Sequence, residues 1–126
     1  MKFKRGIDPN QEFLFPKKPS DFLPDNHLAK AIYEIVKLLN FSKIEVKYSE
    51  TGQNAYAPRM MTSILFYGYS IGVRSSRKIS KGCEERFDFI YLAEGLNPSH
   101  DRIPDFRKEN LEELKELTKR GNESYN

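Results

Sequence analysis

The segment PRMMTSILFYGYSIGVRSSRKISK, residues 58–81, decides the fold. Residues 58–71 are apolar around most of the circumference of a helix, which is typical of a helix buried at the centre of a domain. The proline that opens this helix suits a first turn, and Gly72 stands where a glycine commonly ends one. Gly68 costs about 1 kcal/mol relative to Ala inside a helix. We therefore expect a neighbouring helix to approach closely at Gly68.

A second helix, over residues 76–86, follows after a break of about four residues, and together the two helices predict a helix–turn–helix. Ser75 or Ser76 can cap the second helix. Ile79, Cys83 and Phe87 recur at four-residue spacing and are predicted to face the core. The outer face is basic, because residues 74–81 hold four cations and no acid in a chain with 18 acids.

The start of this second helix is a candidate DNA contact. It offers backbone N–H groups and hydroxyls to phosphates, and arginine forks to guanine edges. The candidate DNA-binding residues are Arg59, Arg74, Ser75, Ser76, Arg77, Lys78 and Lys81. A short helix pair with a basic outer face also occurs in helical proteins that never contact DNA, so the pattern leaves both interpretations open.

The rest of the chain predicts further helices on both sides of this pair. A helix with one apolar face runs from Leu28 to Leu39, and Asp25 or Asn26 can cap it. Residues 41–48 fit either a turn of helix or a short strand, and residues 89–93 are equally ambiguous. A last helix is expected over residues 101–120, with Asp101 as its cap.

No series of alternating strands is present, so we predict an all-α domain, a compact bundle of about five helices. The domain is expected over residues 27–120. Residues 1–26 contain four prolines among large apolar residues, which predicts an extended arm that docks on the body. Residues 121–126 are expected to fray.

Composition limits the functions open to this chain. A length of 126 residues fits one domain, and a net charge of +3 permits an anionic partner without requiring one. A single cysteine excludes an internal disulfide and any multi-cysteine metal site. No apolar run approaches the ~20 residues that span a bilayer, and no apolar stretch marks a signal peptide. We expect a soluble cytoplasmic protein with no metal, cofactor or membrane partner.

No residue pattern indicates catalysis. Cys83 lies on an apolar helix face and is expected to be an inert core thiol. His27 at a helix start favours a capping or surface role, and His100 beside Asp101 has no identifiable nucleophile to activate. The aromatic residues Phe66, Tyr67, Tyr69, Phe87 and Phe89 are expected in the core.

Four blocks, in order, resemble the N-terminal domain of bacterial insertion-sequence transposases, the InsH-like group. The resemblance covers about residues 12–118. The blocks are Phe22-Leu23-Pro24-Asp25-Asn26-His27-Leu28; Tyr56-Ala57-Pro58-Arg59-Met60-Met61 with Leu65-Phe66-Tyr67-Gly68-Tyr69; Gly72-Val73-Arg74-Ser75-Ser76-Arg77-Lys78-Ile79; and Glu84-Glu85-Arg86-Phe87 with Tyr91-Leu92-Ala93, Pro98, Asp101-Arg102-Ile103 and Phe106-Arg107.

The resemblance implies a helical domain that binds the terminal inverted repeats of an insertion sequence, ahead of a catalytic domain with a DDE metal site. This chain has neither the strands nor the length for that catalytic domain, so we expect no enzyme activity and assign no catalytic residue. Two alternatives stay open. The domain could be an assembly module that dimerises or docks on the catalytic domain, as its acidic, leucine-containing helix at 103–117 and its apolar arm suggest, or a small helix–turn–helix regulator.

Overall fold

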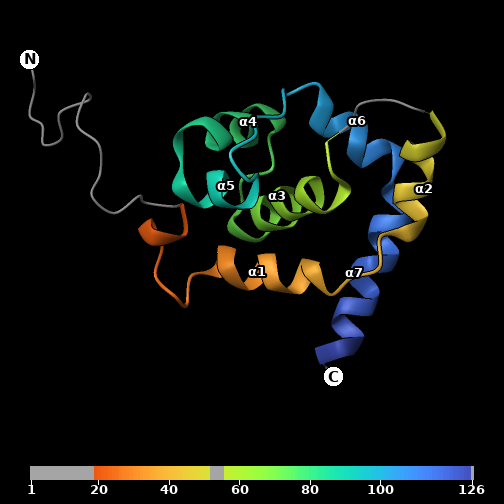
Figure 1. Ribbon diagram of the computed structural model, residues 1–126, viewed down its shortest axis with the longest axis horizontal. Helices are drawn as coiled ribbons and strands as arrows, with labels where there is room; N and C mark the ends of the chain where they lie inside the picture. The colour runs from red at the N-terminus through yellow and green to blue at the C-terminus, as the bar shows by residue number, and fades with distance from the viewer. Residues whose placement is uncertain (1–18, 52–55, 126) are drawn as a thin grey trace, which may run out of the picture.

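The computed structural model describes residues 19–51 and 56–125, and all regular structure in these ranges is helical (Figure 1). This confirms the all-α prediction. A 3₁₀ turn, η1, precedes seven α-helices. Their bounds are η1 Pro19–Phe22, α1 Leu28–Lys37, α2 Ser42–Thr51, α3 Pro58–Ile71, α4 Ser76–Glu85, α5 Phe87–Leu92, α6 Arg102–Glu109 and α7 Leu111–Tyr125.

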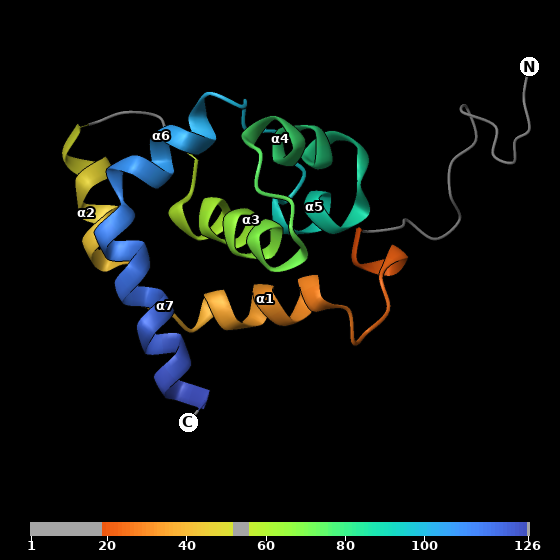
Figure 2. The ribbon, with the colours of Figure 1, turned by 180° about the vertical axis from the view of Figure 1, so that it is seen from behind.

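Helix α3 is the central element. In both views α1 lies along one side of α3, while α4 and α5 lie on the other (Figures 1 and 2). Eight of its fourteen residues are buried. The bounds and the buried character predicted from residues 58–71 are therefore confirmed. At its end, Gly72 adopts φ of 82°, the left-handed conformation that glycine adopts without strain.

The ambiguous segments both form helices. Residues 42–51 make α2, with Phe41 and Ile44 buried, and residues 87–92 make α5, with Phe89 fully buried. Helix α2 is joined to α7 by an ion pair of 2.8 Å between Lys47 Nζ and Glu113 Oε2. These extra helices raise the number of helices above the five expected.

The single helix expected over residues 101–120 is wrong, because the chain breaks at Asn110 between α6 and α7. Asn110 is fully buried and has φ of −121°. Its Nδ2 donates to Phe106 O at 2.9 Å and to Tyr48 Oη at 2.8 Å, and its Oδ1 accepts from Lys47 Nζ at 3.2 Å. Hydrogen bonds to α2 thus favour the interruption over a continuous helix. Beyond the break, α7 continues through residues 121–125, where fraying was expected.

Two predicted helix caps are corrected. Helix α1 is capped by His27, not by Asp25 or Asn26, since His27 Nδ1 accepts from the Ala29 amide at 3.0 Å. The capping role expected for His27 is confirmed. Asp101 makes no side-chain cap bond at α6; its backbone is already helical, with φ of −82° and ψ of −33°, and its carboxylate lies 3.1 Å from His100 Nδ1.

Two of the aromatic residues expected in the core are exposed instead. Tyr67 and Phe89 are buried, but Tyr69 is 67% exposed and Phe87 is 50% exposed. Phe87 does not share a face with Ile79, because α4 ends at Glu85 and the extended Arg86 redirects the chain. The Phe87 ring instead stacks on Phe22 of η1, with centroids 4.2 Å apart.

The predicted arm falls mostly outside the described residues, which begin at Pro19. Its last part, η1, contacts α5 through the stacked pair of phenylalanines. The docking of the arm is therefore observed only for its final residues.

Candidate nucleic-acid interface

The break between α3 and α4 is fixed by the close approach of the chain to Gly68. The Val73 amide donates to Gly68 O at 2.7 Å. A Cβ atom at Gly68 would lie 2.6 Å from Val73 O and 3.2 Å from Ile79 Cδ1. The neighbouring helix expected at Gly68 is thus α4, whose buried Ile79 packs against α3 and holds the outer face of α4 toward solvent.

The other end of α4 is held by α5 and by a buried carboxylate. A Cβ atom at Gly82 would lie 2.7 Å from the Phe89 ring, so these two short helices pack closely. Asp88 accepts from the Tyr67 hydroxyl at 2.6 Å and from two nitrogens of Arg86, at 3.1 Å and 2.6 Å. This cluster ties the α4–α5 junction to α3.

Hydrogen bonding decides the charge of this carboxylate. Burial alone would raise the pKa of Asp88, but the hydrogen bonds from Tyr67, Arg86 and the Phe89 amide outweigh it and hold the pKa below its usual range. The carboxylate is therefore ionised at neutral pH, where its charge pairs with Arg86. Every oxygen of Asp88 has a partner, so its role is to position α4.

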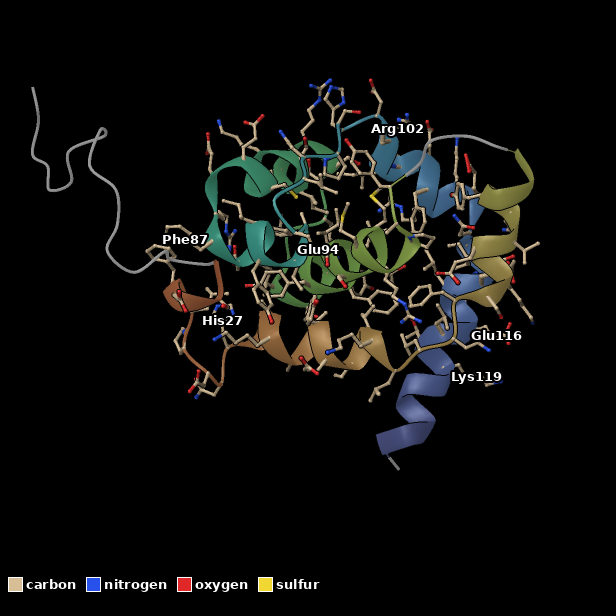
Figure 3. The ribbon with its side chains drawn as sticks, viewed as in Figure 1. His27, Phe87, Glu94, Arg102, Glu116 and Lys119 are labelled. Carbon is tan, nitrogen blue, oxygen red and sulfur yellow. The ribbon has the colours of Figure 1, made fainter. Side chains whose placement is uncertain are left out.

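The loop before α6 runs along α4. Ser80 of α4 donates to Pro98 O at 2.8 Å, and Asn97 Nδ2 donates to Glu84 Oε1 at 2.8 Å. Helix α6 also contacts α4 directly. The loop leads to Arg102, the first residue of α6, whose exposed side chain lies beside that helix (Figure 3).

Three of the predicted cations lie on the exposed surface of α4, in agreement with their expected orientation, and the fourth lies in the break before the helix. Arg74, Arg77, Lys78 and Lys81 are exposed, and within the described part of the chain none of them forms an ion pair. The Arg74 guanidinium lies 4.6 Å from the centroid of the Tyr69 ring. We call these four residues the basic edge.

The charge order along α4 opposes the helix dipole. Cations lie in its first turn, whereas Glu84 and Glu85 lie in its last turn. A cation near a helix N-terminus is unfavourable by about 0.3–1 kcal/mol, since that end carries partial positive charge. Neither an intrahelical ion pair nor the helix dipole therefore stabilises the cations of the basic edge.

The other three candidate DNA-binding residues, Ser75, Ser76 and Arg59, lie at two different places in the fold. Ser75 caps α4 by accepting from the Lys78 amide at 3.4 Å, which confirms one of the two predicted caps, and Ser76 is half-buried beside it. Arg59 lies in the first turn of α3, roughly 20 Å along the helix axis from the end that leads to Arg74. Its Nη1 donates to Val36 O at 2.8 Å and to Lys37 O at 3.1 Å, and its guanidinium lies 4.8 Å from the Phe41 ring centroid. The structure thus places Arg59 at the C-terminus of α1.

Arg102 is the residue that sequence analysis missed. It is an exposed cation on α6, a helix that contacts α4, and the loop before α6 is bonded to Ser80 and Glu84 of α4. Arg102 lies 21 positions after Lys81 in the chain, so no local spacing could have grouped them.

The buried thiol behaves as the sequence predicts. Cys83 is 4% exposed, and burial raises its pKa to about 12. Within residues 19–51 and 56–125, no three His, Cys, Asp or Glu side chains gather into a group that could hold a metal ion. No helix in this part of the chain combines the length and apolarity needed to cross a membrane.

These features define a small all-α domain with an exposed cationic edge on one short helix. Residues 17–109 match the family model described as Transposase domain (DUF772). The match covers well over half of the chain, so the protein belongs to this transposase domain family. No curated protein and no solved structure matches the chain.

Proposed function

We infer that this domain is the DNA-binding part of a cytoplasmic transposase and that it recognises the terminal inverted repeats of an insertion sequence. In this proposal α3 and α4 act as a helix–turn–helix, and α4 is the helix that contacts DNA. The domain contributes binding, while strand cleavage and joining belong to a catalytic domain of the transposase.

The observation that carries the proposal is the basic edge, whose cations gather at the N-terminal end of α4 although the helix dipole disfavours them there. A duplex supplies a dense row of phosphates, which would neutralise these cations and release the counterions that they hold. The α4 N-terminus adds backbone amides for a phosphate. Arg77 and Lys81, one turn apart, are offered as the pair closest to the duplex, and Arg102 extends the same contact from α6.

A salt titration tests this proposal. Binding is measured by fluorescence anisotropy on two labelled duplexes, one with the terminal inverted repeats and one with the same bases scrambled. We expect tighter binding to the repeats and a steep fall of log K with log salt. Arg77→Ala and Lys81→Ala should each lower the magnitude of that slope by about one.

Lys119→Ala is the matched control, because Lys119 is an exposed cation on α7, away from the basic edge. It should leave the slope unchanged. If Arg77→Ala also leaves affinity and slope unchanged, α4 is not the DNA-contacting helix. Equal, weak binding to both duplexes would contradict recognition of the terminal inverted repeats and would show only a general affinity for DNA. A stable dimer that binds neither duplex would make the domain an assembly module instead.

A further inference from the structure

A second surface, on the side of α3 away from α4, is an apolar groove with a volume of about 690 Å³. Its walls come from α1, α3 and α7, with Arg107 of α6 at its margin. Helix α7 runs across the end of α1 in both ribbon views, and its last turns project past α1 (Figures 1 and 2).

Each wall presents large apolar side chains at the spacing of a helix ridge. The pairs are Ile35 and Leu39 on the α1 side, Phe66 and Tyr69 on α3, and Leu111 and Leu114 on α7. Tyr69 is 67% exposed and Leu111 is 44% exposed, so this apolar surface is open to solvent. Ridges three and four residues apart are the surface into which the side chains of another helix interlock.

The walls also restrict the backbone conformation of an occupant. All three wall elements are helices, whose interior N–H and C=O groups are bonded within the helix, so the groove has no sheet edge to which an extended segment could add. A segment that enters an apolar groove must satisfy its own backbone groups. A helix meets that requirement, whereas an extended strand does not.

The charge of the groove restricts the occupant further. Among the described residues that line it, Arg107 and Lys115 are the charged ones, and both are cations. Neither forms an ion pair within the described residues. Carboxylates that flank the apolar stripe of a docked helix would complement both.

The described helices of this chain do not present such a stripe. The exposed large apolar residues are Phe22, Leu28, Leu38, Val46, Tyr69, Phe87, Leu96 and Leu111. No two of them stand three, four or seven residues apart on one helix. A second copy of this fold therefore has no described helix that fits the groove.

The geometry points to this groove as a docking site for an amphipathic helix of a partner protein, with leucine-type anchors at i, i+3, i+4 and i+7 and flanking glutamates or aspartates. The groove adjoins the basic edge at Tyr69, whose ring centroid lies 4.6 Å from the Arg74 guanidinium, and it would engage protein where that edge would engage DNA.

Two labelled peptides of about 18 residues, with the same leucine stripe, test the site in the full chain. One carries glutamates beside the stripe, and the other carries lysines at the same positions. Fluorescence anisotropy should show the acidic peptide binding about tenfold more tightly than the basic one. The double variant Arg107→Glu/Lys115→Glu should reverse that preference.

Two controls separate charge from apolar contact. Lys119→Glu changes a cation on α7 that does not line the groove, and it should preserve the preference for the acidic peptide. Leu111→Gln should weaken both peptides several-fold, whereas Leu38→Gln, at an exposed leucine outside the groove, should weaken neither.

The proposal is overturned by several results. These are no binding of either peptide, equal binding of both, or a charge-reversed variant with the original preference. A peptide that binds only after removal of residues 1–18 would assign the groove to the chain's own N-terminus. A dimer that Leu111→Gln dissociates would assign it to a second copy. The assay contains no DNA, so its outcome is independent of the proposed DNA binding.

Discussion

In the Gly68→Ala variant, helix propensity and packing predict changes of opposite sign in the free energy of unfolding. Ala is favoured over Gly inside a helix by about 1 kcal/mol, so propensity alone would stabilise the variant. The new Cβ atom, however, would lie 2.6 Å from Val73 O and 3.2 Å from Ile79 Cδ1. The nearer atom belongs to the backbone, which cannot rotate away as a flexible side chain can.

The packing term is the larger. Overpacking a buried site costs about 1–3 kcal/mol. Displacing residue 73 also strains the 2.7 Å hydrogen bond from the Val73 amide to Gly68 O, which is worth about 1 kcal/mol. After the propensity gain is subtracted, we expect a net loss of about 1–3 kcal/mol.

Urea denaturation followed by circular dichroism measures this loss as a lower midpoint at an unchanged slope. Gly72→Asn is the control, because nothing lies within 4 Å of a Cβ atom there and asparagine tolerates the φ of 82° better than other side chains. Its midpoint should move little. A Gly68→Ala variant that is more stable than the parent would refute the close approach of α4 to α3.

Three further predictions concern single side chains. Asp88→Asn should destabilise the fold by about 1–3 kcal/mol at neutral pH. Because the pKa of Asp88 is lowered in the folded state, its contribution to the free energy of unfolding is present above about pH 4 and is lost as the pH falls further. Urea curves at pH 3 should therefore show a smaller difference in unfolding free energy between parent and variant. An equal difference at both pH values would contradict an ionised Asp88. Arg59→Met should lower stability by about 1–2 kcal/mol through loss of its bonds to the α1 carbonyls, and a reduced salt slope of DNA binding in this variant would contradict that structural role. Cys83 should react with iodoacetamide at pH 8 far more slowly in the folded chain than in urea, because burial raises its pKa to about 12, and equal rates would contradict its burial.

Local signals predicted the centre of the fold well. Apolar periodicity and the flanking Pro58 and Gly72 gave the bounds of α3, and Gly68 indicated the close contact with α4. These signals succeed because each depends on residues within one or two turns. The exposure of the basic edge was predicted for the same reason, since the core side of α4 is set by Ile79 and Cys83 on the same helix.

The features that sequence analysis missed depend on distant partners. Asn110 ends α6 because it bonds to Tyr48 of α2, 62 residues away. Arg59 bonds to carbonyls 22 and 23 residues earlier, and no spacing along the sequence indicates those contacts. Arg102 and the groove are likewise products of tertiary packing, and no single stretch of sequence encodes either of them.

Helix α3 gives the two proposed surfaces a common base. Gly68 on α3 receives Ile79 and so sets the position of α4, while Phe66 and Tyr69 line the groove that α1 and α7 complete. A helix buried over most of its circumference holds both neighbours in fixed positions, because its core contacts resist rotation. In the two proposals the domain presents cations of the α4 region to a nucleic acid and apolar ridges of the groove to a protein helix, and the two surfaces meet where the Arg74 guanidinium lies against the Tyr69 ring.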